Sequence, residues 1–188
     1  ANALDAFALV DERVEYVLPL RGIGGDGFQA VYPTIAAALE ATLLARLALP
    51  SGLDCRFGLG LGQVVEGGDG TTGGQQDGSA WWLAREASNE VHRREELRTP
   101  MLRAWFRAEG DKAALESVVN AYLLARDHIV GGMSDRARRL TFGTLRGLLQ
   151  GEIAEAEGIS QSAVSQTLRR SGGVSLVAAI EELAWMAG

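Results

Sequence analysis

The residues that offer chemistry fall in a few short stretches, and the first is a glycine-rich segment at residues 22–29. Asp26 lies there among glycines, with Gly25 before it and Gly27 after it. Because glycine reaches φ > 0 without steric cost, such a run predicts a tight turn that holds the Asp26 carboxylate at or just past its tip. A carboxylate between two short strands can bind a metal ion. The simpler alternative is a hairpin turn that carries a solvated aspartate.

The second stretch, residues 55–65, alternates glycines with larger apolar residues. This period of two predicts a strand with one apolar face and one face of bare backbone. The two faces are Phe57, Leu59 and Leu61, and Gly58, Gly60 and Gly62. Because glycine weakens a strand interior, we expect a ligand, a partner chain or a tightly packed helix to approach the glycine face closely. The stretch lacks the third glycine and the immediate helix of a dinucleotide-binding motif, so we exclude that fold.

The third stretch begins a predicted helix, with Asp77 or Ser79 as its N-cap and Leu97 near its end. Trp81 and Arg85 are neighbours one turn apart on it. An aromatic ring beside a guanidinium suits a nucleotide. The alternative is core packing for the tryptophan and a solvated surface charge for the arginine. We expect the adjacent Trp82 in the core.

The strongest motif covers residues 152–170 and follows the pattern of a helix-turn-helix. Ala154 is small where two helices cross, Gly158 forms the turn, Ile159 fills the corner and Ser160 caps the second helix. Val164 and Leu168 then face inward. The outward residues can contact base edges and phosphates, and we predict them as the DNA-binding set: Gln161, Ser162, Ser165, Gln166, Arg169 and Arg170.

Charge around this motif bears on what it binds. Residues 134–173 contain six arginines and four acidic residues, which gives 6 − 4 = +2. Arg136, Arg138 and Arg139 lie upstream, where they would suit phosphates. A charge of +2 predicts weak binding by one copy, and therefore a homodimer. A protein-binding helical hairpin is the alternative; the lack of acids on the outward face favours DNA.

The remaining pattern supplies the elements that position these residues. We predict helices over residues 2–14, 33–49, 111–129 and 174–186, and another from Ser134 through Leu149. Strands are predicted at residues 16–20, 28–32 and 101–108, and a glycine-rich surface loop at residues 66–78. In the 111–129 helix the side chains expected inward are Leu115, Val118, Val119, Tyr122 and Leu123. Gly131 and Gly132 mark a break, so we predict domains over residues 1–131 and 132–188.

Composition limits the class of protein. The chain has 188 residues, 47% hydrophobic and 22% charged, with a net charge of −6. No apolar run approaches the roughly 18 residues of a membrane span, and no signal-peptide pattern is visible. The single Cys55 excludes an internal disulfide and suits a reducing cytoplasm. With His92 and His128 also isolated, no zinc site is expected.

Three of these stretches together resemble the palm domain of class III nucleotidyl cyclases and GGDEF proteins. They are Gly25-Asp26, the strand Arg56-Phe57-Gly58-Leu59-Gly60-Leu61-Gly62-Gln63-Val64-Val65, and the helix start Asp77-Gly78-Ser79-Ala80-Trp81-Trp82-Leu83-Ala84-Arg85. With the C-terminal helix-turn-helix, the chain resembles the SatD family of bacterial proteins. The resemblance implies an α+β fold: a ferredoxin-like cyclase/GGDEF-type palm joined to a small all-α helix-turn-helix module.

The resemblance also implies a nucleotide site, with Mg²⁺ or Mn²⁺ on Asp26. Its residues would be Gly25, Asp26, Gly58, Gly60, Gly62, Trp81 and Arg85. The chain departs from the pattern, because Gly27 replaces the usual second acid and Trp81 the ribose-binding Asn. A cyclase also needs a second metal-binding Asp on a strand that we do not find before Asn2. One carboxylate cannot hold two catalytic metals.

We therefore expect a cytoplasmic bacterial DNA-binding regulator with a degenerate palm that senses a nucleotide or mediates dimerisation. Two alternatives stay open. One is an active cyclase or phosphotransferase whose metal-binding strand lies upstream, and the other is a protein-interaction module.

Overall fold

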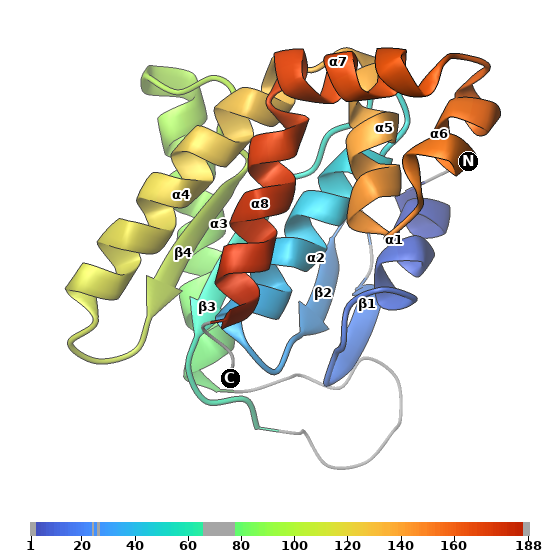
Figure 1. Cartoon of the computed structure of the whole chain (residues 1–188). Coiled ribbons are helices and arrows are strands. Elements are labelled where there is room, and N and C mark those ends of the chain that lie inside the picture. The colour runs from blue at the N-terminus through green and yellow to red at the C-terminus, as the bar shows by residue number, and fades with distance from the viewer. Residues whose placement is uncertain (1–2, 24, 26, 66–77, 186–188) are drawn as a thin grey trace. The chain divides into compact units, whose positions relative to one another are not determined.

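The structure is a computed structural model that describes residues 3–23, 25, 27–65 and 78–185 (Figure 1). It divides into two compact units, one formed by Ala1–Asp54 with Gly132–Gly188 and the other by Cys55–Gly131. The predicted break at Gly131 and Gly132 coincides with a unit boundary. The predicted first domain, residues 1–131, differs from both units, because residues 1–54 group with the C-terminal helices.

The first unit begins with a helix, a hairpin and a second helix. These are α1 (Ala3–Asp11), β1 (Leu18–Gly22), β2 (Phe28–Val31) and α2 (Ile35–Ala48). The strands pair antiparallel, with Gly22 opposite Phe28, so the glycine-rich stretch does join two strands. Thr34 begins α2 as its N-cap, since its Oγ1 accepts a hydrogen bond from the Ala37 N–H at 3.1 Å. The Phe7 and Phe28 rings meet edge to face, 4.6 Å apart.

Four short helices complete this unit: α5 (Asp135–Leu145), α6 (Gln150–Glu157), α7 (Gln161–Ser171) and α8 (Gly173–Ala184). The predicted helix through Leu149 is too long, because α5 ends at Leu145 and residues 146–149 link it to α6. Leu148 and Leu149 lie in that link and are exposed. Contacts with the N-terminal segment hold α5 in place: Arg13 Nε donates to the Leu145 carbonyl at 3.1 Å, and Arg138 donates to the Arg46 carbonyl.

The second unit is a βαβ arrangement followed by a helix. It comprises β3 (Phe57–Leu61), α3 (Ser79–Leu97), β4 (Ala104–Ala108) and α4 (Ala113–Gly131). β3 and β4 pair parallel, with Phe57 opposite Ala104 and Leu61 opposite Ala108. Figure 1 shows α4 running alongside β4. A small core lies between α3 and β4, made of Ala87, Val91, Leu102 and Trp105, with Leu124 of α4 against it.

The architecture is α+β, as predicted. Within the described residues the strands form two sheets of two strands each, β1–β2 in the first unit and β3–β4 in the second, and the ferredoxin-like palm stays a prediction. None of the described helices is long and apolar enough to cross a membrane.

Candidate functional site

A three-residue turn connects α6 to α7. Gly158 ends α6 with φ +64°, a left-handed conformation that glycine adopts without strain. The Ile159 N–H donates to the Ala154 carbonyl at 3.0 Å, and Ser160 caps α7 through its Oγ, 3.2 Å from the Ala163 nitrogen. The sequence therefore specifies this turn residue by residue.

The inward residues of α6 and α7 form one small core with α5. Its buried members are Leu140, Ile153, Ala154, Val164 and Leu168, and Ile159 packs against it from the turn. Because Val164 and Leu168 are buried in this core, the opposite side of α7 faces solvent. The roles predicted for Ala154, Ile159, Val164 and Leu168 agree with this packing.

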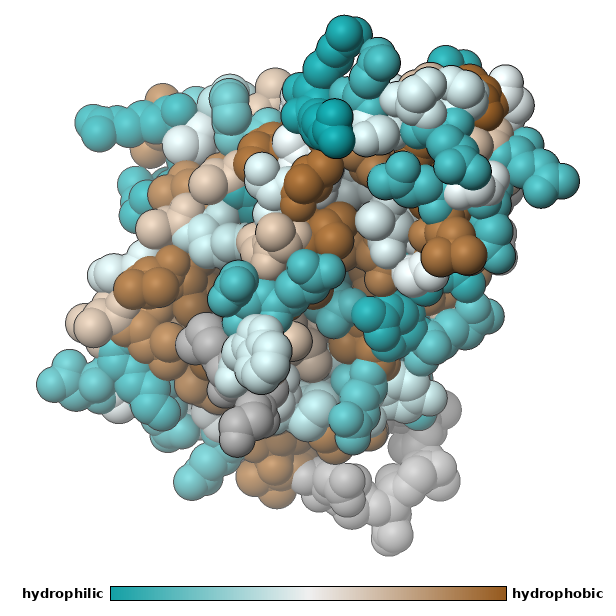
Figure 2. Space-filling view, viewed as in Figure 1, coloured by the Kyte–Doolittle hydropathy of each residue, from teal (hydrophilic) through white to brown (hydrophobic). Residues whose placement is uncertain are grey.

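The outward side of α7 carries the predicted DNA-binding residues. Five are exposed and Ser165 is half-buried; the exposed ones are Gln161, Ser162, Gln166, Arg169 and Arg170. We call these six side chains the α7 face. No acidic residue occurs in α7, and the two arginines lie in its last turn. In Figure 2, hydrophilic side chains project from the edge of the molecule where α7 lies in Figure 1.

The arginines of α5, predicted to suit phosphates, are engaged within the protein. Arg139 makes a two-pronged contact with the Glu157 carboxylate, at 2.6 and 2.8 Å, and Arg136 Nε lies 3.8 Å from it. The hydrogen bond from Arg139 lowers the pKa of Glu157 below its ordinary value. Arg138 is bonded to the Arg46 carbonyl. Among the described residues, no carboxylate forms an ion pair with Arg169 or Arg170, and both side chains are exposed.

The predicted nucleotide site falls in both units. Asp26, the predicted metal ligand, lies outside the described residues. Gly25 has φ +62°, and no atom of the described residues lies within 4 Å of the position of a Cβ there, so the structure gives it only the conformation of a turn. Across the described ranges, no group of three or more His, Cys, Asp or Glu side chains lies close enough to hold a metal ion.

The glycine face of β3 is covered by α3. A Cβ on Gly58 would lie 1.8 Å from the Ala84 carbonyl oxygen, and one on Gly60 would lie 2.2 Å from the Ala80 oxygen. At Gly62 the nearest atom would be Ser79 Oγ, at 2.5 Å. Of the three explanations for this face, the structure therefore supports the tightly packed helix. The glycines permit close packing instead of lining an open cleft.

The two tryptophans of α3 are placed opposite to expectation. Trp82, predicted in the core, is 64% exposed, while Trp81 is half-buried with its indole N–H enclosed. The Arg85 guanidinium lies 6.0 Å from the Trp82 ring centre. The exposed aromatic ring beside Arg85 is therefore that of Trp82, whereas the role of Trp81 in nucleotide binding stays a prediction.

Polar residues of α4 bind the outer edge of β4, which the sequence reasoning missed. Asn120 pairs with both backbone groups of Phe106, at 2.8 and 3.0 Å. Asp127 accepts hydrogen bonds from Arg103 N and Ala104 N, at 2.6 and 2.8 Å. Glu116 accepts one from Ala108 N at 2.8 Å. A sequence feature could have indicated these contacts: Asn120 and Asp127 lie on the same buried side of α4 as Val119 and Leu123. A polar residue on an apolar helix face needs a hydrogen-bond partner there.

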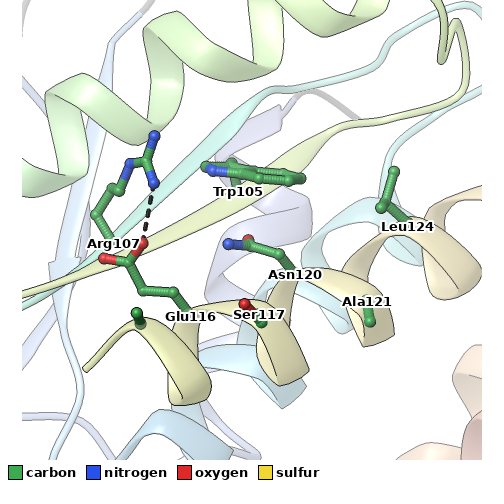
Figure 3. Close-up of a pocket in the computed structure, with 8 residues that line it drawn as sticks. Trp105, Arg107, Glu116, Ser117, Asn120, Ala121 and Leu124 are labelled. Carbon is green, nitrogen blue, oxygen red and sulfur yellow. Dashed lines mark hydrogen bonds and ion pairs between the residues drawn. The ribbon is translucent and has the colours of Figure 1, made fainter.

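A groove of about 370 Å³ lies between these two elements (Figure 3). We call it the β4–α4 groove; Trp105, Arg107, Ala113, Glu116, Ser117, Asn120, Ala121 and Leu124 line it. Figure 3 shows the Trp105 ring on one side and α4 on the other, with the ion pair of Arg107 and Glu116 (2.9 Å) at one end. Glu116 and Asn120 already form hydrogen bonds with the backbone of β4. Most of the hydrogen-bonding groups of this groove therefore hold the strand and are not available to a ligand.

Trp105 is itself held from the α3 side. The Arg94 guanidinium lies 3.9 Å from the centre of its ring, a close cation–π contact. The Trp105 side chain is buried and the Arg94 side chain is half-buried, so the ring side of this contact is shielded from water.

A family model described as the SatD family matches residues 16–178. No curated protein and no solved structure gives a significant match.

Proposed function

The chain belongs to the SatD family, and we propose that it is a DNA-binding regulatory protein whose α7 enters the major groove as the recognition helix of a helix-turn-helix. The observation that carries this proposal is the α7 face. It joins four amide or hydroxyl side chains to two arginines on an exposed helix without an acid.

The chemistry of the α7 face matches what duplex DNA requires. Glutamine and serine side chains both donate and accept hydrogen bonds, so they can contact base edges in the major groove. Arg169 and Arg170 have no carboxylate partner in the described part of the chain, so each can neutralise a phosphate. The cap at Ser160 and the core under α7 keep the helix rigid, which lowers the entropy cost of docking.

Selection from a random duplex library tests this function. We expect the protein to enrich a short sequence motif, and to enrich none when the α7 face is changed by Gln166→Ala together with Arg169→Ala. Failure of the wild-type protein to enrich any motif, or to bind duplex DNA at low salt, contradicts the proposal. Far-ultraviolet circular dichroism of both proteins checks that the variant is folded.

Protein contact through the same helices is a second candidate. Leu148 and Leu149, 44% and 71% exposed just before α6, favour it because neighbouring exposed apolar side chains form a patch of the kind that marks protein interfaces. The two functions differ in their dependence on salt and on Leu149. Leu149→Ser leaves DNA affinity unchanged if α7 reads DNA, and abolishes capture of a partner protein if the helices form a protein interface.

We extend the proposal to a cyclase-like palm that senses a nucleotide or mediates dimerisation without turnover. One support is the order of the elements: the hairpin β1–β2 with its glycine turn is followed by α2, by the glycine-containing strand β3 and then by α3. A second support is the exposed pair of Trp82 and Arg85 on α3. Thermal shifts with ATP and GTP, with Mg²⁺ or Mn²⁺, test for binding. A cyclic or linked nucleotide product would favour the active-cyclase alternative instead.

Dimerisation follows from the charge of the helical module. With a formal charge of +2 over residues 134–173, one module supplies few phosphate contacts, whereas a two-fold dimer places two recognition helices one DNA turn apart. Light scattering of the protein alone and on DNA measures this directly, and a monomer in both states contradicts it.

A further inference from the structure

The side chain that begins α7 lies close to a glycine at the start of α6. A Cβ on Gly151 would lie 3.0 Å from Gln161 Nε2 and 3.9 Å from Gln161 Cδ. The amide end of Gln161 therefore extends across the turn and lies against the backbone of the second residue of α6. A side chain at position 151 would displace that amide.

Glycine at position 151 lowers the stability of α6 relative to alanine, and the backbone conformation there does not require a glycine. Within a helix, glycine is less favourable than alanine because it loses more backbone freedom on folding. Gly151 is helical, and its φ lies outside the positive range that requires glycine. The space that it leaves for Gln161 is the one feature of its surroundings that an alanine would remove.

The backbone at Gln161 is also fixed. Ser160 caps α7 by accepting from the Ala163 N–H, and its Oγ lies 2.9 Å from Ser162 Oγ. Gln161 is thus the first residue of a capped helix. Its amide lies against Gly151, and the residue as a whole is exposed to solvent. In helix-turn-helix proteins, the N-terminal residues of the recognition helix contact the base edges.

We infer that Gln161 reads an adenine in the major groove and that Gly151 is the positioning residue that aims its amide. The chemistry is specific, since a carboxamide can donate to adenine N7 while accepting from adenine N6. This inference rests on the proposed function, because it assigns one base contact within the α7 face.

The experiment uses the motif that the wild-type protein selects from random duplexes, followed by titrations on that site. We expect the preference for adenine over the other bases at one position of the site to fall about 10- to 100-fold in Gln161→Ala, because one bidentate contact is lost. Gln63→Ala, which removes an exposed glutamine from the other unit, serves as the matched control and keeps the full preference.

Gly151→Ala separates positioning from stability. We expect the melting temperature to stay equal or rise, because alanine favours the helix, while discrimination at the same adenine falls at least threefold. A purely structural Gly151 predicts no change in base preference. The salt dependence of binding should stay unchanged, since no phosphate contact is lost.

A second measurement changes the DNA and compares the wild-type protein with Gln161→Ala. Replacing the selected adenine by 7-deazaadenine removes the N7 acceptor, and we expect the wild-type protein to lose affinity at that position but Gln161→Ala to lose none. Specific DNA binding in which Gln161→Ala keeps every base preference overturns the inference while the proposed function stands. If the wild-type protein selects no motif, the proposed function fails and this inference falls with it.

Discussion

The α7 face and the β4–α4 groove both carry amide, hydroxyl and arginine side chains but use them differently. On α7, glutamine, serine and arginine side chains are exposed, and α7 itself carries no acid. Around the groove, Glu116 and Asn120 bond to the edge of β4, and Arg107 pairs with Glu116. Polar side chains that already satisfy buried backbone groups contribute to stability, whereas those left facing water remain available for a partner. This difference supports the proposal that α7 is the binding surface.

Asp127→Ala should cause the largest loss of stability. Asp127 is fully buried, pairs with Arg126 at 2.9 Å and accepts from two backbone N–H groups at the start of β4. Removing the carboxylate takes the acceptor from both N–H groups and the counter-charge from a buried guanidinium, so we expect unfolding free energy to fall by about 3–5 kcal/mol. Urea denaturation measures this loss. The exposed Asp111→Ala is the control, and equal losses in both would contradict the account.

Gly58→Ala should be nearly as severe. A methyl group there would overlap the Ala84 carbonyl, so β3 and α3 must separate, and we expect a loss of about 3 kcal/mol. Gly22→Ala is the matched control, because Gly22 also lies in a strand but has no atom within 4 Å of a Cβ position. That control should change stability by less than about 0.5 kcal/mol. A mild effect at Gly58 would reopen the glycine face as a ligand surface.

Much of the fold follows from local residues. Thr34, Ser134 and Ser160 each cap the helix that the sequence places after them. The phase of α3 was harder to predict, because its inward stripe consists of small residues such as Ala80, Ala84 and Ala87 that fit the glycines of β3. The large apolar Trp82 therefore lies outside the buried face of α3 and is exposed. Val118 of α4, also predicted inward, is 70% exposed.

Long-range pairings explain the rest of what the sequence did not reveal. Ser51 bonds to Asp135 at 2.6 Å, and Arg146 reaches Glu12 at 3.2 Å, so the N-terminal segment groups with the C-terminal helices. No local pattern encodes contacts between residues that far apart. Among the site residues, the outward set of α7 was predictable because a 3.6-residue period and a cap define its phase. The edge contacts of α4 were not, because they depend on where β4 lies.

Glu157→Gln tests whether intramolecular pairing restrains DNA binding. The change removes the charge that holds Arg136 and Arg139, both more than half exposed. We expect DNA affinity to rise a few-fold, with the salt slope steeper by about 1 for each arginine that gains a phosphate. Fluorescence anisotropy at several salt concentrations measures both quantities. Weaker binding would mean that Glu157 orients these arginines for DNA and does not restrain them.

The smallest predicted effect is a pH dependence on α3. The hydrogen bond from Arg93, and next that from Arg94, lowers the pKa of Glu90 from 4.5 to about 2. Because the folded pKa is depressed, the stability that this group contributes is present above about pH 4.5 and is lost as the pH falls toward 2. Wild type and Glu90→Gln should therefore differ in unfolding free energy at neutral pH and converge at acid pH. Arg93 is exposed and Arg94 is half-buried, so 1 M salt should reduce the difference mainly through the Arg93 pair. A difference that persists at pH 2 would contradict this assignment.

The salt dependence of duplex binding, measured for the wild-type protein and for Arg169→Ala/Arg170→Ala, tests the role of α7 most directly. We predict a linear fall of log K with log salt in the wild type, and a slope smaller in magnitude by about 1.8 in the variant, because two phosphate contacts are lost. Unfolding free energy should be the same in both proteins, since neither side chain is buried. Equal slopes, or wild-type binding that does not respond to salt, would contradict the assignment of α7 as the DNA-binding surface.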